Sequence, residues 1–116
     1  MVKVLTRGDA DFYPLLGPVF GSRQIEKITH DRFYDDTGKI WYVFAGRGAA
    51  SVSGATIKNF YAENSETAEA ILRSMKEKHS HLTGIVPRIY QAEFEAAGFD
   101  VLEYKRNFME VSYGQD

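Results

Sequence analysis

The feature that most constrains the fold is an amphipathic helix pattern between two strand-like runs. Residues Thr56–Ala62 (TIKNFYA) and Leu82–Val86 (LTGIV) are short and rich in apolar and β-branched residues, as strands are. Between them, Glu66–Lys78 carries one apolar stripe at helical spacing. The members of the stripe are Ala68, Ile71, Leu72 and Met75. A helix that joins two strands in this way predicts a parallel crossover, with the stripe packed on the sheet.

The flanking segments predict antiparallel strands around this crossover. The other strand-like runs are Val2–Thr6, Ile40–Ala45, Ala49–Ser53, Phe99–Tyr104 and Asn107–Tyr113. Short turns connect the runs between Ile40 and Ala62 and also the last two runs, and such short connections join antiparallel neighbours. A short or broken helix is expected after Asp9 or Asp11, and another between Pro87 and Gly98. The predicted fold is α/β: a mixed sheet, antiparallel in its N-terminal part, with one parallel crossover and flanking helices.

Length and composition exclude several classes of site. The 116 residues suit one domain, 1–116, with its own core. The chain has no cysteine, which excludes disulfides, thiolate metal sites and a cysteine nucleophile. His79 and His81 lie one residue apart without an evident third ligand, so no metal site is expected. The first residues lack an apolar signal core, and the longest apolar run is too short to span a bilayer. We therefore expect a cytoplasmic protein that does not cross a membrane.

Charge and aromatic content bear on partners. The formal net charge is -2, and the closest basic pairs, Lys105–Arg106 and Lys76 with Lys78, are flanked by acidic residues. Duplex nucleic acid is bound through a basic face, so nucleic acid is not an expected partner. Aromatic residues make up 14% of the chain, which fits a core rich in Phe and Tyr and also a face for homodimer formation.

The order of elements resembles that of the GNAT superfamily of acetyltransferases. The segment FEAAGFDVLEYKRNFMEV, with its Gly98–Phe99 step before a hairpin, looks like the end of the family's domain. The segment TIKNFYAENSETAEAILRSM looks like its central strand and the helix that follows. The resemblance implies acetyl-CoA as the acyl donor and a small-molecule or protein amine as the acceptor. Small GNAT-like proteins of phages and prophages look similar.

The resemblance also implies where each function would lie. The diphosphate of acetyl-CoA would meet the start of the helix, and the pantetheine arm would lie along the end of the central strand like an added strand. The cofactor-binding candidates are therefore Asn59, Phe60, Tyr61, Ala62, Ser65, Thr67 and Ala68. Glu63 is the candidate general base. Phe94 stands where the family has its proton-donating tyrosine, so Tyr90, one helical turn earlier, is the candidate acid.

The chain departs from the family's phosphate motif. Glu63 stands where the motif has Arg or Gln, Glu66 stands on its first glycine, and Glu69 adds a third carboxylate. Two like charges 4 Å apart repel by about 4 kcal/mol at an effective dielectric constant of 20. An ordinary helix capped by Asn64 or Ser65 explains the same residues, and Tyr90 would then be a half-buried side chain with its hydroxyl in water.

Two functions therefore stay open. One is an N-acetyltransferase with a diverged cofactor site. The other is a non-catalytic GNAT-like module that binds protein, as a scaffold or an inhibitor.

Overall fold

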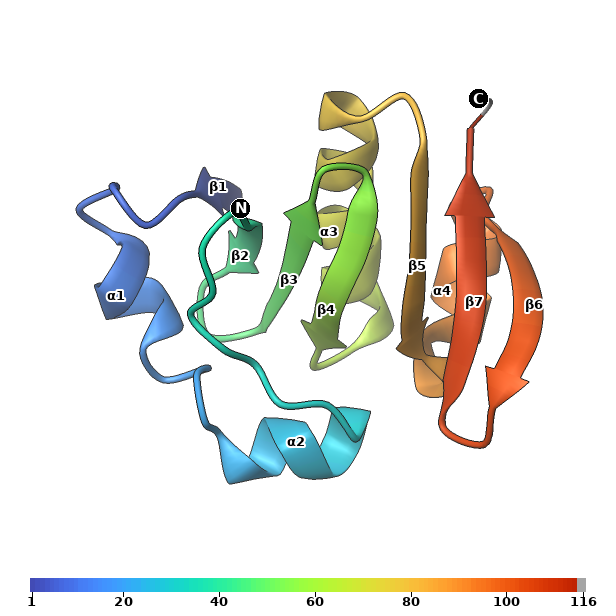
Figure 1. The fold of residues 1–116 in the computed structure, drawn as a ribbon, viewed down its shortest axis with the longest axis horizontal. Coiled ribbons are helices and arrows are strands. Elements are labelled where there is room, and N and C mark those ends of the chain that lie inside the picture. The colour runs from blue at the N-terminus through green and yellow to red at the C-terminus, as the bar shows by residue number, and fades with distance from the viewer. Residues whose placement is uncertain (115–116) are drawn as a thin grey trace.

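The computed structural model describes residues 1–114 of the chain. A seven-stranded mixed sheet forms the centre of this part of the molecule (Figure 1). The strands lie in the order β1-β2-β3-β4-β5-β7-β6, and only β4 and β5 pair in parallel. Their bounds are β1 Val2–Leu5, β2 Ile40–Phe44, β3 Gly48–Ser53, β4 Thr56–Ala62, β5 Leu82–Pro87, β6 Asp100–Lys105 and β7 Phe108–Tyr113. The expected crossover and the antiparallel pairing around it are confirmed.

Five helical segments accompany the sheet in residues 1–114. They are α1 Phe12–Leu16, α2 Arg23–Thr29, α3 Ser65–Lys78, the 3₁₀ turn η1 Arg88–Tyr90 and α4 Gln91–Ala96. Helix α1 has one proline inside it and ends at Gly17, so it stays short, as expected. Asp11 occupies its N-cap position without a hydrogen bond from its side chain to the helix, and the side chain of Asp9 accepts from the backbone N–H of Thr6. None of the described helices is long and apolar enough to cross a membrane.

The helices cover the two faces of the sheet unequally. Helices α3 and α4 lie behind the sheet in Figure 1 and pack on it through the larger of two buried clusters. The expected stripe of α3 is fully buried there, which confirms the periodicity. The smaller cluster lies under α1 and α2 and reaches only the N-terminal half of the sheet. The opposite face of β5 and β6 therefore stays open, with Ile85 and Leu102 exposed.

The segment before β6 differs in detail from its expected single helix. It begins with the turn η1, and this turn places Ile89 outside and Tyr90 inside. Of the apolar residues expected on this helix, Phe94 is the one that is fully buried. Gly98 ends the segment with a positive φ of 92°, the conformation for which glycine is favoured at a helix end.

The parallel contact between β4 and β5 is short and very close. Only Thr56 pairs with Thr83 and Ile57 with Gly84. A Cβ on Gly84 would lie 2.8 Å from the carbonyl oxygen of Ile57, so the close approach requires glycine at this position.

A β-bulge in β4 comes directly after the residues that pair with β5. Ile57 lies opposite Val52 of β3 and Asn59 lies opposite Ser51, so Lys58 is an extra residue in β4. Beyond this bulge β4 has no register with β5, and the two strands diverge toward their C-terminal ends (Figure 1). This divergence is the feature of the fold that makes room for a site.

Candidate functional site

A cavity of about 520 Å³ lies where β4 and β5 diverge. It is bounded by the end of β4, the start of α3, the turn η1 with α4, and the side of α2. Its lining residues are Gln24, Ile28, Tyr61, Ala62, Glu63, Asn64, Ser65, Ile89, Tyr90 and Glu93. The cavity thus gathers five of the predicted site residues: Tyr61, Ala62, Glu63, Ser65 and Tyr90. None of the described residues that line it is lysine or arginine.

The hydroxyl of Tyr90 closes the inner end of this cavity against β4. It donates to the carbonyl oxygen of Ala62 and accepts from the N–H of Ala62, both at 3.0 Å. Tyr90 is only 5% exposed, and its ring packs edge-on against Phe60. The expectation of a half-buried tyrosine with its hydroxyl in water is therefore wrong. Burial raises the pKa of Tyr90 to about 12, so the hydroxyl keeps its proton at neutral pH.

The edge of β4 that faces the cavity is made by alternate residues. Tyr61 pairs with Ala49 of β3, and the N–H of Glu63 donates to the carbonyl oxygen of Arg47, also on the β3 side. By the alternation of an antiparallel ladder, the backbone groups of Phe60 and Ala62 point toward β5. Those of Ala62 are the groups that Tyr90 occupies. An added strand at this edge must therefore displace the Tyr90 hydroxyl or pair beside it.

The start of α3 is a capped helix. The side chain of Asn64 accepts from the N–H of Thr67 at 2.8 Å, with Asn64 itself in an extended conformation. Such a cap satisfies one of the free N–H groups at the helix start. The capping expected from the sequence is confirmed, and Asn64 is the residue that provides it.

Carboxylates surround this helix start, but in an arrangement that the sequence did not predict. Glu63 pairs with Arg47 of the β3 side at 3.3 Å, so its charge is partly compensated at the mouth of the cavity. Glu66 is exposed in the first turn of α3. Glu93 of α4 accepts a hydrogen bond from the hydroxyl of Ser65, and its other oxygen, Oε1, is buried without a partner among the described residues.

Glu93 is the residue that the sequence reasoning missed. Its carboxylate points at the start of α3 from the neighbouring helix, 28 residues away in the chain. A signal was present, because Glu93 follows Tyr90 by three residues and such residues share one face of a helix. Once Tyr90 is a candidate, Glu93 is the polar side chain expected beside it.

The other predicted cofactor residues do not line the cavity. Phe60, Thr67 and Ala68 are buried in or beside the core, where they position β4 and α3. Asn59 points to the face of α2. Its amide accepts from Lys39 at 3.0 Å and from Ser51, and it donates to Asp31 at 2.9 Å.

Asp31 belongs to this internal polar cluster. Burial raises the pKa of the Asp31 carboxyl, while its bond from the Asn59 amide opposes the shift. The cluster joins the loop after α2 to the sheet and so fixes the side of the cavity that α2 forms.

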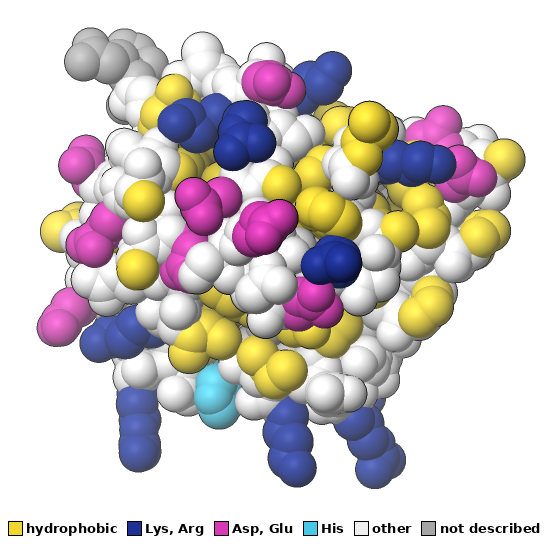
Figure 2. All heavy atoms as spheres, turned by 180° about the vertical axis from the view of Figure 1, so that it is seen from behind, with side chains coloured by type: hydrophobic (Ala, Val, Ile, Leu, Met, Phe, Trp, Pro, Cys, Tyr) yellow, Lys and Arg dark blue, Asp and Glu magenta, His cyan; other side chains and the backbone are white. Residues whose placement is uncertain are grey.

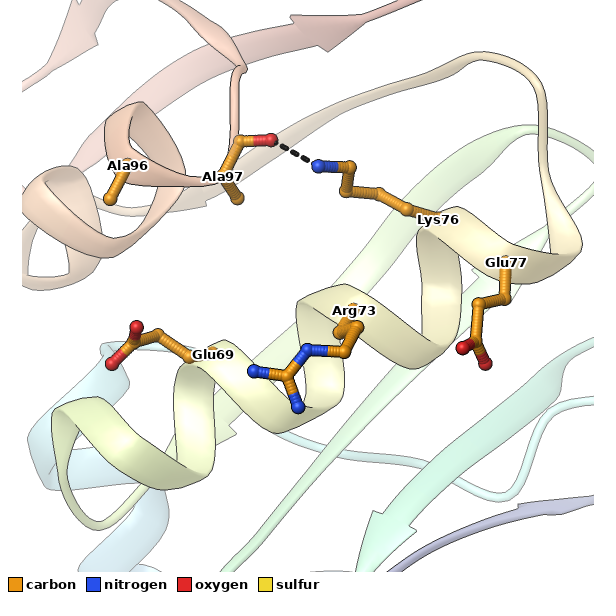
Figure 3. Close-up of a pocket in the computed structure, with 6 residues that line it drawn as sticks. All are labelled: Glu69, Arg73, Lys76, Glu77, Ala96 and Ala97. Atoms are coloured by element: carbon orange, nitrogen blue, oxygen red, sulfur yellow. Dashed lines mark hydrogen bonds between the residues drawn. The ribbon is translucent and has the colours of Figure 1, made fainter.

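A second hollow of about 350 Å³ lies between α3 and the end of α4 (Figure 3). It is lined by Glu69, Arg73, Lys76 and Glu77 of α3 and by Ala96 and Ala97. Lys76 crosses it and donates to the carbonyl oxygen of Ala97 at 2.6 Å. The charged lining is balanced, with two residues of each sign. The wider surface over α3 and α4 likewise intersperses acidic and basic side chains (Figure 2).

The described residues contain no group of three or more His, Asp or Glu side chains placed to hold a metal ion. The cavity brings together tyrosines, carboxylates and the edge of β4.

Two of the three comparisons with known proteins found no relative. No family model matches the chain, and no curated protein matches it. Among solved structures, the chain is similar to the N-acetyltransferase PseH of Campylobacter jejuni, with a TM-score of 0.58 and 14% identity over 99% of each chain. It is similar to the same enzyme in complex with acetyl coenzyme A, with a TM-score of 0.57 and 14% identity over 100% of each chain.

This likeness defines the fold. The chain has a GNAT-like α/β fold, a mixed seven-stranded sheet with one parallel pair and flanking helices. The fold class expected from the element order is confirmed.

Proposed function

We propose that this chain is an N-acyltransferase that takes an acyl group from a thioester such as acetyl-CoA and transfers it to an amine. The divergence of β4 and β5 after the Lys58 bulge carries the proposal, because it opens the cavity at the end of the central strand. The likeness to PseH, whose structure with acetyl coenzyme A shares this fold, supports the choice of donor.

The residues present fit the two ends of acetyl-CoA differently. The cavity beside Phe60 and Ala62 suits the uncharged pantetheine arm, since amide groups of the arm can pair with a strand edge. The start of α3 does not suit the diphosphate, because carboxylates and no glycine meet it there. The donor supplies the acyl group as a thioester.

Glu63 is the general base of this transfer, and Tyr90 is its general acid. The amine nitrogen forms a bond to the acyl carbon, and the carbon–sulfur bond breaks. Glu63, held at the cavity mouth by Arg47, accepts the proton that the amine loses. Tyr90, whose hydroxyl is protonated at neutral pH, returns a proton to the leaving sulfur. To do so, it gives up its bond to the carbonyl oxygen of Ala62.

The test is a thiol-release assay with acetyl-CoA and a panel of small primary amines and amine-bearing peptides. Because the chain has no cysteine, every thiol detected comes from the donor. We expect release that depends on the amine and falls by about 100-fold or more in Glu63→Gln, in line with the loss of a general base. Glu77→Gln, which removes the same charge at the far end of α3, is the matched control. No release above the rate without protein, for any amine, would refute the proposal.

A second candidate is a non-catalytic module that binds protein, of the kind that resembles phage-encoded GNAT-like proteins. One observation favours it: Tyr90 already occupies both backbone groups of Ala62, where a pantetheine arm would pair. Calorimetry with acetyl-CoA separates the two candidates. Binding in the micromolar range supports the enzyme, and no detectable heat together with no thiol release supports the module.

A further inference from the structure

We propose that this chain recognises the acyl-pantetheine part of its thioester donor and leaves the nucleotide diphosphate without a binding site. The inference rests on the proposed acyltransferase function and specifies which part of the donor this chain binds.

The start of α3 is built in a way that disfavours a diphosphate. A diphosphate that binds at a helix start needs backbone N–H groups that are free and can be approached closely. Here Asn64 already takes the N–H of Thr67. The two residues between them, Ser65 and Glu66, both carry side chains, and the chain has no glycine between Gly54 and Gly84. The cap therefore takes one N–H group of the helix start, and the side chains of Ser65 and Glu66 hinder close approach to the others.

The charge around this helix start also disfavours a diphosphate. Glu93 has one oxygen on the Ser65 hydroxyl and the other buried without a partner among the described residues, beside the same helix start. Glu66 adds an exposed carboxylate in the first turn. The lining of the cavity includes Glu63 and Glu93 and, among the described residues, no lysine or arginine. Arg47 offsets part of the charge of Glu63, so the carboxylates of Glu66 and Glu93 are the like charge that a dianionic diphosphate meets here. The uncharged arm meets no such repulsion.

The hollow between α3 and the end of α4 offers the diphosphate no substitute site. In the groove between α3 and α4, Arg73 lies four residues from Glu69 and from Glu77, so each carboxylate neighbours it on the helix surface (Figure 3). Lys76 is bound to the carbonyl oxygen of Ala97 and lies 4.8 Å from the centre of the Tyr113 ring. Lys76 already has partners, and the two carboxylates of the groove offset its two cations, so a phosphate gains little there.

The experiment compares acetyl-CoA with S-acetylpantetheine, which has the same thioester and arm but no phosphate. Both are assayed by transfer to one amine under identical conditions. We expect kcat/KM values within about threefold of each other, because the nucleotide contributes no favourable contact. Raising the ionic strength should improve acetyl-CoA relative to S-acetylpantetheine, because salt screens repulsion between like charges.

A variant at Glu66 tests the charge at the start of α3 separately from the residues that line the cavity. Glu66→Gln removes one carboxylate that does not line the cavity, and we expect it to raise kcat/KM for acetyl-CoA by about two- to fivefold. Glu77→Gln, at the other end of α3, is the matched control and should leave the ratio of the two donors unchanged.

The outcomes separate the inference from the function on which it rests. A preference of more than tenfold for acetyl-CoA, weakened by salt, would overturn the inference and leave the acyltransferase function standing. Transfer from neither donor would overturn the function, and the inference with it. Similar use of both donors, with a gain for acetyl-CoA in Glu66→Gln, supports both.

Discussion

The bond between Tyr90 and the end of β4 can be tested by removing one oxygen atom. Tyr90→Phe keeps the ring against Phe60 and deletes the hydroxyl that serves both the N–H and the carbonyl oxygen of Ala62. Ala62 is only 5% exposed, so both of its groups lose their partner in a largely buried place. An unsatisfied buried group costs about 1–3 kcal/mol.

The adjoining cavity sets the size of the effect. Water in the cavity can reach the freed groups of Ala62 and recover part of the loss. We therefore expect Tyr90→Phe to lower the free energy of unfolding by about 1–3 kcal/mol in total, rather than by the sum for two orphaned groups. Urea denaturation at pH 7, followed by circular dichroism, measures this difference.

The matched control is Tyr104→Phe, which removes the same atom from a side chain that is 51% exposed. Its cost should stay within about 0.5 kcal/mol, as for other surface substitutions. If Tyr90→Phe costs no more than Tyr104→Phe, the hydroxyl does not bond Ala62 in solution, and the reasoning about the occupied strand edge fails.

The same residue gives a pH signature with a defined sign. The pKa of Tyr90 is raised to about 12 in the fold, from the ordinary value of 10.0. Between these values the unfolded chain binds fewer protons than the folded one, so stability falls as the pH rises. The contribution of Tyr90 is fully present below pH 10 and is lost as the pH approaches 12. Tyr90→Phe should show a smaller alkaline loss than the native chain.

Three further perturbations test the fold. Leu72→Ala, at a fully buried site on α3, should cost about 2–5 kcal/mol, and a loss below about 1 kcal/mol in a two-state melt would contradict the packing. Gly84→Ala should cost about 1–3 kcal/mol, because its Cβ would meet the backbone of Ile57, whereas Gly8→Ala, with open space around it, is the control. Partial burial lowers the pKa of His79 below 6.5, so the contribution of His79 to stability is present above pH 6.5 and is lost as the pH falls through the lowered pKa. His79→Gln should therefore reduce the difference in stability between pH 7 and pH 5, as measured by urea denaturation at both values.

Local patterns in the chain predicted most of the architecture. The stripe on α3 follows from spacing within one helix, and the Asn64 cap follows from residues three apart. The strand assignments rest on runs of a few residues between turn residues. Such patterns depend on backbone geometry over one or two turns, which the sequence displays directly. The parallel pairing followed because a helix between two strands leaves few other arrangements.

Only part of the predicted site lines the cavity, because neighbouring residues of one strand face different sides of the sheet. The sequence placed the site at the end of β4 and the start of α3, where Ala62, Glu63 and Ser65 do line the cavity. Neighbouring positions alternate across the strand, so Asn59 turns to the α2 face and Phe60 enters the core. Which side of β4 each residue takes depends on the bulge at Lys58, and no local pattern announces that bulge.

The sequence by itself determined the strand–helix–strand core, the buried stripe of α3 and its cap. Only the tertiary structure decided that Tyr90 bonds Ala62 and that Glu93 bonds Ser65, each pair 28 residues apart in the chain. These contacts depend on how far β4 and β5 diverge and on how the turn η1 rotates α4 toward α3. The physical reason is that a side chain's partners across the sheet are set by the packing of whole elements, whereas periodicity and capping are set by neighbours within one element.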